Sequence, residues 1–292
     1  YLLANIDSLI TANKDSLALS ALENINSAEL NGNDMAYYNL LKVRTMYKLS
    51  IPIKDDSLIN ICIDHYKNNG DNKMLAEAYF YKSTTNHDRH NVNAAITYMK
   101  MAEEAANNTN DENTKYKIYE KLDMYNSSAN EYDLSIYYGK KALEIAKKTG
   151  NNNYIAYAYA NLAISQMWKG NTDSARLYII KCLPYTKYMR KQDLAYVYDV
   201  IGEIYKKSKK EYAETYLKKA LEIHPLPWTY KRLAELYLEE GREAEANKIW
   251  DKALDFKTGR TLGGIETKIE ILEDMRELKQ KYGYHREADS IA

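Results

Sequence analysis

The sequence predicts an all-α fold, a stack of antiparallel helical hairpins in which each hairpin packs mainly on its neighbours. Three series of residues indicate this fold. In each series, residues of one kind recur at intervals of about 40 positions, and one interval is shorter, at about 33. The first series consists of small residues: Ala95, Ser135, Ala175, Ala213, Ala246 and Ala288. A second series of small residues follows seven positions behind: Ala102, Ala142, Cys182, Ala220 and Ala253. The third series is aromatic and runs ahead of both: Tyr79, Tyr119, Tyr159, Tyr198 and Tyr230.

The composition permits long helices and argues against two classes of partner. Four prolines and eleven glycines in 292 residues leave long stretches free to be helical. Lysine plus arginine and aspartate plus glutamate both number 41, so the chain lacks the basic excess that a nucleic-acid partner normally requires. No run of about 18 apolar residues occurs, so no membrane span is predicted in this segment. The chain begins with Tyr1 rather than Met, which leaves room for a removed signal segment or a membrane tether outside it.

The N-terminal part is predicted to form two divergent hairpins. Its first three helices are expected over residues 1–13, 15–30 and 35–49. Pro52 ends the third, and Asp55 or Asp56 is predicted to cap a fourth. We therefore separate these hairpins, residues 1–70, from the more regular array over 71–292, within one continuous solenoid.

The clearest hairpin is predicted over residues 153–187. Gly150 suits the left-handed conformation that ends the preceding helix, and the asparagines after it suit the start of the next. One face of the first helix carries four residues at spacings of three and four: Tyr159, Leu162, Ala163 and Gln166. Gly170 and Asn171 break the helix, and the second helix packs through Ala175, Ile179 and Cys182.

Two later units repeat this pattern more fully and resemble the tetratricopeptide repeat (TPR) family. That family's pattern is an aromatic residue, leucine with a small residue, then Tyr, Gly, Ala, a bulky residue and Ala. One unit supplies Tyr198, Ile201, Gly202, Tyr205, Ala213, Leu217, Ala220 and Pro225. The next supplies Tyr230, Leu233, Ala234, Tyr237, Gly241, Ala246, Trp250 and Ala253. Two earlier units match less fully, at Tyr79, Ala95, Met99 and Ala102 and at Tyr119, Leu122, Ser135 and Ala142.

The last residues are predicted to begin one more hairpin. Its first helix would contain Leu272, Met275, Lys279 and Gly283, and Ala288 would open its second. The count is then six full hairpins and part of a seventh. Since a terminal repeat needs a polar cap, we expect the natural protein to continue beyond Ala292.

The resemblance implies a right-handed superhelix, a TPR-like α-solenoid, whose first helices line a concave face. It also implies a protein or peptide partner rather than a substrate. The opening, with Ile6-Asp7-Ser8-Leu9-Ile10, further resembles bacterial periplasmic or surface-anchored TPR regulatory proteins, some of which are lipoproteins. A periplasmic or cell-surface location is therefore expected, with the cytoplasm as the alternative.

Catalytic and metal-binding signatures are absent from the sequence, so we predict no enzyme activity, no cofactor and no metal. His87 and His90 are three residues apart, but they fall at a predicted helix end, where polar turn residues are the simpler interpretation. Cys62 and Cys182 are too few and too far apart to indicate a disulfide framework or a zinc site.

The candidate binding residues form one row on the first helices, set by the family register. The row mixes aromatic, apolar and charged side chains, which suits an extended peptide or a partner helix. The selected residues are Tyr81, Lys121, Met124, Tyr157, Asn161, Ile164, Trp168, Tyr196, Glu203, Trp228, Arg232 and Glu235. The same row contains Glu77, Thr84, Lys117 and Val200. Trp250, by contrast, is predicted to be a core residue.

Two functions are compatible with these features. The first is a non-enzymatic scaffold whose groove binds a peptide or a segment of a partner protein. The alternative is the sensor half of a larger bacterial signalling or transcriptional regulator. A third interpretation, in which the array supports an enzyme, has no catalytic set of residues behind it.

Overall fold

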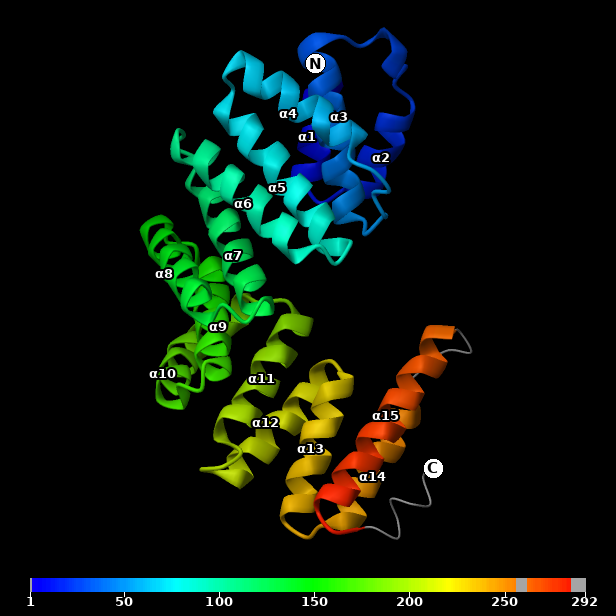
Figure 1. Ribbon diagram of the computed structural model, residues 1–292, viewed down its shortest axis with the longest axis vertical. Coiled ribbons are helices and arrows are strands. Elements are labelled where there is room, and N and C mark those ends of the chain that lie inside the picture. Colours follow the sequence, from blue (N-terminus) through cyan, green and yellow to red (C-terminus); the bar gives the residue numbers. More distant parts are fainter. Residues whose placement is uncertain (1, 256–261, 285–292) are drawn as a thin grey trace. The chain divides into compact units, whose positions relative to one another are not determined.

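The computed structural model describes residues 2–255 and 262–284, with side chains described through 255 and again from 270 (Figure 1). Every regular element in this part of the chain is a helix. The chain divides into two compact units, Tyr1–Ser165 and Gln166–Ala292, here called unit 1 and unit 2. This division lies within a helix, and the predicted boundary at residue 70, which concerns the regularity of the repeats, stays a prediction.

Unit 1 contains four pairs of helices. The elements are α1 (Leu2–Thr11), α2 (Asp15–Glu23), the short 3-10 helix η1 (Ser27–Glu29), α3 (Gly32–Lys48), α4 (Ser57–Asn69), α5 (Asn72–Asp88), α6 (Val92–Asn107), α7 (Glu112–Ser128) and α8 (Tyr132–Thr149). Helix α9 (Asn152–Trp168) contains the boundary between the units.

Unit 2 continues the same alternation. Its elements are α10 (Thr172–Cys182), the 3-10 helix η2 (Leu183–Tyr188), α11 (Lys191–Tyr205), α12 (Lys210–Ile223), α13 (Pro227–Glu239), α14 (Glu243–Asp255) and α15 (Leu262–Lys281). The described residues thus contain seven pairs of helices and the first helix of an eighth. The sequence analysis predicted one pair fewer, six full hairpins and part of a seventh. The part of the predicted last hairpin that contains Ala288 lies outside the described residues.

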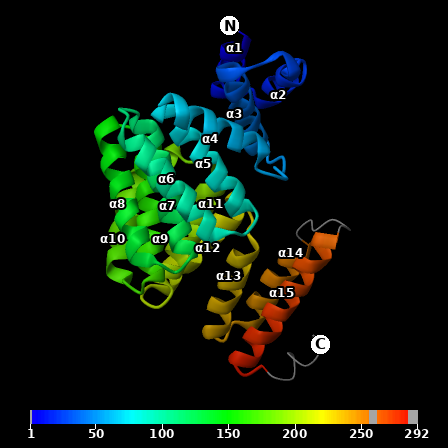
Figure 2. The same ribbon diagram turned by 45° about the horizontal axis from the view of Figure 1, so that its top comes forward.

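The helices pack as the repeat pattern predicts. Within each unit the two helices of a pair contact each other, as in α5 with α6 and α11 with α12. First helices also contact the next first helix, in unit 1 along α1, α3, α5 and α7 and in unit 2 along α11, α13 and α15. Figures 1 and 2 both show α13 beside α15. The predicted fold class, an all-α TPR-like solenoid, is therefore confirmed.

The two small-residue series define the packing between helices. Ala95, Ser135, Ala175, Ala213 and Ala246 are all fully buried, as are Ala102, Cys182 and Ala220. Trp250 is also buried, with 1% of its surface exposed, as expected for a core residue. The aromatic series is less uniform, because Tyr119, Tyr159 and Tyr230 are buried while Tyr79 and Tyr198 are only half-buried. The register taken from the sequence is thus correct for the small residues that the structure describes; Ala288 lies outside them.

Local signals in the sequence set the helix ends. The side chains of Asp71, Asn91 and Asp111 each accept a hydrogen bond from the backbone N–H three residues later, which caps α5, α6 and α7. Asp55 Oδ1 accepts from the Ser57 N–H at 2.8 Å, so this carboxylate satisfies the start of α4. Gly150 has φ of 65° and ends α8 in the left-handed conformation that was predicted.

One close approach in unit 2 requires glycine. An added Cβ at Gly202 in α11 would lie 2.5 Å from Leu217 in α12, far inside van der Waals contact. The family pattern places a small residue at this position, and the tight packing of α11 on α12 explains why it is glycine here.

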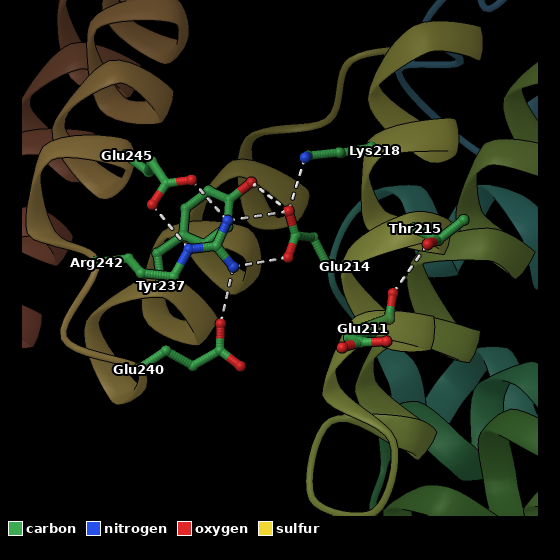
Figure 3. Close-up of polar contacts among 8 residues, drawn as sticks. All are labelled: Glu211, Glu214, Thr215, Lys218, Tyr237, Glu240, Arg242 and Glu245. Carbon is green, nitrogen blue, oxygen red and sulfur yellow. Dashed lines mark hydrogen bonds and ion pairs between the residues drawn. The ribbon is translucent and has the colours of Figure 1, made fainter.

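A polar cluster joins α12 to the turn between α13 and α14 (Figure 3). Arg242 follows that turn and bonds Glu214 of α12 at 2.8 Å and Glu245 of α14 at 2.6 Å. Tyr237 and Lys218 also donate to Glu214, at 3.0 and 2.6 Å. The hydrogen bond from Arg242 is the main reason that the pKa of Glu214 is lowered to about 2. This cluster fixes three consecutive helices of unit 2 at their polar ends.

Candidate functional site

In unit 1 the predicted row residues lie on α5, α7 and α9. Tyr81 is buried, with 8% of its surface exposed, contrary to its prediction as part of an exposed row, and its ring packs edge-on against Tyr47 at 5.7 Å between centroids. Met124 is exposed, and the remaining predicted residues of this unit, Lys121, Tyr157, Asn161 and Ile164, are half-buried.

In unit 2 five predicted residues lie together on the neighbouring first helices α11 and α13: Tyr196, Glu203, Trp228, Arg232 and Glu235. The rings of Tyr196 and Trp228 meet edge to face, with centroids 6.3 Å apart and planes at 87°. Trp228 nevertheless keeps 46% of its surface exposed. Trp168, at the end of α9, is 52% exposed. Both tryptophans that were predicted to be exposed are therefore exposed.

Arg232 has a structural task beside this aromatic pair. Its guanidinium pairs with the carboxylate of Asp199, which is fully buried in α11, and its Nε lies 3.3 Å from Glu203. Thr229 donates a second hydrogen bond to Asp199 at 2.8 Å. Sequence analysis missed Asp199, although a single carboxylate among Val197, Val200 and Ile201 is the signal that could have found it.

Glu235 belongs to a second charged group on the same face. Its carboxylate receives Lys206 at 2.5 Å, Lys281 at 2.7 Å and the Tyr282 hydroxyl at 3.2 Å. Burial alone would raise the pKa of Glu235, but the hydrogen bonds from the two lysines outweigh burial and lower the pKa to about 2. Glu235 therefore joins α11, α13 and the end of α15, and it stays ionised at neutral pH.

Two other positions of the predicted row are buried rather than exposed. Val200 and Thr84 each keep 1% of their surface exposed. Neighbouring first helices contact each other directly, so a short side chain at these positions is covered, whereas a longer one reaches the surface. The Thr84 hydroxyl instead donates to the Tyr81 carbonyl oxygen within its own helix, at 3.0 Å.

Unit 1 contains a cavity of about 410 Å³ between its first helices α1, α3, α5 and α7. Charged residues of both signs line it: Asp7, Arg44, Asp71, Lys73, Glu77, Asp111 and Lys117. Arg44 Nη1 lies 2.8 Å from Asp7 and 3.4 Å from Glu77. Part of the wall is apolar, from Leu40, Leu41, Met74, Phe80 and Tyr81.

The predicted row included Glu77 and Lys117 but missed Asp7 and Arg44 as their neighbours. The row was assigned only to first helices from residue 77 onwards, so it contained neither Asp7 nor Arg44. Charged residues that recur on successive first helices were the available signal.

The two histidines have different surroundings. His87 stacks on Tyr125, with ring centroids 4.4 Å apart, and His90 has φ of 60° in the turn after α5. Within the described residues no group of three or more His, Cys, Asp or Glu side chains is placed to hold a metal ion. None of the described helices has the length and apolar character that crossing a membrane requires.

The sequence matches no protein-family model, and no curated protein matches it. Solved structures do resemble it. A Rap protein complexed with competence and sporulation factor aligns with a TM-score of 0.68 and 17% identity, over 99% of this chain and 94% of that chain. NprR in complex with its cognate peptide NprX aligns with a TM-score of 0.68 and 15% identity, over 99% of this chain and 86% of that one.

The description of a third similar structure mentions the tetratricopeptide repeat. A STAND signal-transduction ATPase with a tetratricopeptide repeat sensor, from Pyrococcus horikoshii, aligns with a TM-score of 0.72 and 16% identity. The match covers 96% of this chain and 43% of that chain. At such identities the likeness concerns the fold, and this chain has the fold of tetratricopeptide-repeat proteins.

Proposed function

We propose that this chain is a non-enzymatic TPR scaffold that binds a peptide, or an extended segment of a partner protein, on the face formed by its first helices. The observation that carries the proposal is the aromatic pair on α11 and α13, in which the half-buried Tyr196 holds the exposed Trp228. A tryptophan that is half exposed yet held by a neighbouring ring is suited to anchor an apolar side chain of a ligand.

Polar groups beside the pair are suited to hold the backbone of that peptide. Glu203 lies one to two turns along α11 from Tyr196 and stays partly exposed although it pairs with Arg232. Burial raises the pKa of its carboxyl, which indicates that its negative charge is incompletely satisfied. A peptide N–H donated to Glu203 would meet that need.

The test is selection from a library of random nine-residue peptides displayed on phage. We expect the wild-type protein to enrich a family of sequences with an apolar residue at a fixed position. Trp228→Ala should lower the affinity of an enriched peptide about tenfold or more, since it removes the anchor. Tyr137→Ala is the matched control, because Tyr137 is an exposed ring held edge-on by Tyr138 on the second helix α8.

Equal affinity of the wild-type protein and Trp228→Ala for every enriched peptide would contradict the proposal, as would the absence of any enrichment. Arg232→Ala is a poor test, because it leaves the buried carboxylate of Asp199 without its cation.

A second function, the sensor half of a larger regulator, is supported by what the similar structures are. One is a signalling ATPase with a TPR sensor, and NprR was solved with its cognate peptide. This proposal expects the gene to encode an output domain, such as a DNA-binding or signalling domain, in the same chain. Sequencing the complete gene tests it, and a gene without any such domain would contradict it. The periplasmic or cell-surface location stays a prediction.

A further inference from the structure

We propose that the outer face of α10 and η2 in unit 2 is a membrane-contact surface, which lies on a bilayer with anionic headgroups. The contact is peripheral: apolar side chains enter the headgroup region, and lysines beside them pair with the lipid charges. This surface belongs to a second helix and the short element after it, whereas the proposed peptide site lies on the first helices α11 and α13. The proposal therefore goes beyond peptide binding, and either one can fail alone.

Helix α10 is apolar on two opposite faces. Its packing face holds Ala175, Ile179 and Cys182, which are all buried. On the opposite side, Leu177 and Ile180 keep 50% and 55% of their surface exposed. A second helix of a repeat array needs one apolar face, which packs on its neighbours in the stack. A further apolar face in water indicates contact with something outside the array.

The exposed apolar positions continue into η2. Pro184 is exposed and follows Leu177 by seven residues, two helical turns, so Leu177, Ile180 and Pro184 form one row, here called the outer row. The backbone of Leu183 stays in the right-handed helical conformation, so the chain passes from α10 into η2 without a turn. Tyr188, at the end of η2, is 42% exposed. A tyrosine ring with its polar hydroxyl suits the boundary between lipid and water.

The charged residues around the outer row are all positive. Between Asp173 and Asp193 the chain carries five cations and no acidic residue, although its acidic and basic residues are equal in number overall. The five cations are Arg176, Lys181, Lys187, Arg190 and Lys191. This local excess makes the surface complementary to an anionic one.

The two arginines are engaged within the fold. Arg176 lies 3.3 Å from Asp173 and donates to the Ser208 hydroxyl at 2.7 Å. Arg190 lies 2.7 Å from Asp193. By contrast, the three lysines are exposed, and within the described residues none of them has an ion-pair partner. The lysine charges are therefore the ones available to an external anion.

Free lysines beside an apolar row favour a lipid surface over other anionic partners. Protein–protein interfaces are enriched in arginine and depleted in lysine. A fluid bilayer instead suits lysine, because the aliphatic stem lies along the apolar boundary while the ammonium reaches the headgroups. A nucleic-acid backbone would contact the lysines and leave the apolar row in water.

Co-sedimentation of the whole chain with lipid vesicles tests this assignment. One set of vesicles is phosphatidylcholine alone, and the other contains about one third phosphatidylglycerol, which is anionic. We expect the protein to bind the anionic vesicles about tenfold more strongly than the neutral ones. Raising the salt concentration from about 0.1 M to about 0.5 M should weaken this binding severalfold, since salt screens the attraction of the lysines.

A double substitution of lysines tests the charges. Lys181→Gln with Lys187→Gln should lower binding to anionic vesicles about tenfold or more, because each lysine near such a surface contributes roughly fivefold. The matched control is Lys248→Gln with Lys252→Gln, which removes two exposed lysines from the second helix α14 of the same unit. This control should bind like the wild-type protein.

A double substitution in the outer row tests the apolar contact. Leu177→Ser with Ile180→Ser should weaken binding to anionic vesicles about tenfold, because both side chains are proposed to enter the headgroup region. Leu134→Ser is the control, since Leu134 is 48% exposed on α8 of unit 1, and it should have no effect. Thermal melting establishes that each variant is folded.

Three results would overturn the proposal: no binding to anionic vesicles at the lower salt concentration, equal binding to both kinds of vesicle, or the same loss in the controls as in the matched variants. Binding of soluble polyglutamate or single-stranded DNA without any binding of vesicles would also overturn it, and would assign the lysines to an acidic macromolecule. Trp228→Ala, which tests the peptide site, should leave vesicle binding unchanged.

Discussion

At the scale of single residues, the buried carboxyl of Asp123 makes stability depend on pH. Its carboxyl is buried in unit 1, where its hydrogen-bond partners in the described contacts are two hydroxyls, Ser135 at 2.5 Å and Ser165 at 3.2 Å. Burial without a cation raises the pKa of Asp123 to about 7, and nearby Glu120 adds to the increase. The folded protein therefore holds a proton here that the unfolded chain has already lost.

This raised pKa makes stability fall as the pH increases. Between about pH 4 and pH 7 the native state binds more protons than the unfolded state, so this contribution declines over that range by up to roughly 4 kcal/mol. Asp123→Asn keeps an acceptor for the serines but cannot ionise. We expect it to be more stable than the wild-type protein at pH 8, and the gain to shrink towards pH 4, in urea unfolding at both pH values.

Asp173→Asn is the control for this comparison, because the side chain of Asp173 is 98% exposed. It should shift the unfolding free energy by the same small amount at both pH values. An Asp123→Asn variant whose difference from the wild-type protein does not depend on pH would show that Asp123 does not titrate in this range.

Asp123 also shows why the sequence alone could not predict every important residue. The position after Leu122 in α7 corresponds to Ala163, Gly202 and Ala234 in later first helices, where the family pattern has a small residue. The recurring aromatic and small residues identified the unit without this position. Only the three-dimensional contact with Ser135, itself in the small-residue series, explains how a carboxyl is held there.

At the scale of helices, the small residues act as spacers, and Ala246 in α14 is a direct test of that role. It is fully buried in the core of unit 2, in the same cluster as Leu233 and Trp250. A leucine there adds three carbon atoms to a closed contact, so Ala246→Leu should lower the unfolding free energy by roughly 1–3 kcal/mol. Denaturant unfolding followed by circular dichroism measures this loss.

Ala244→Leu provides the matched control, since it makes the same change in the same helix at an exposed position. It should alter stability by no more than about 0.5 kcal/mol. Equal losses for the two variants would mean that the register of α14 is wrong.

Helix identity and order were predictable because the small residues and the breaks recur at a fixed interval. Gly150 and Gly170 mark breaks that the structure has, with φ of 65° and 87°. The candidate site was predictable only in part, because exposure depends on the neighbouring helix. Trp228 is exposed, whereas Val200 is covered, although the register assigned both to the same exposed row.

At the scale of the whole chain, the two candidate sites belong to different units. The aromatic pair lies on α11 and α13, and the charged cavity lies between α1, α3, α5 and α7. Both use the face of first helices, which is the face that the register assigned to binding. A repeat array can carry separate sites in this way because each repeat contributes its own side chains to the same row.

The contacts between neighbouring repeats also predict how a destabilising substitution in one repeat affects the others. In an array whose repeats contact mainly their neighbours, a destabilised repeat opens locally before distant repeats do. Ala246→Leu should therefore speed amide hydrogen exchange in α13 and α14 and leave α3, α5 and α7 at the wild-type rate. Hydrogen exchange read by mass spectrometry at several times resolves these segments. Faster exchange by an equal factor in all of them would instead show that the chain unfolds as a single cooperative body, and that stability in one unit depends on the other.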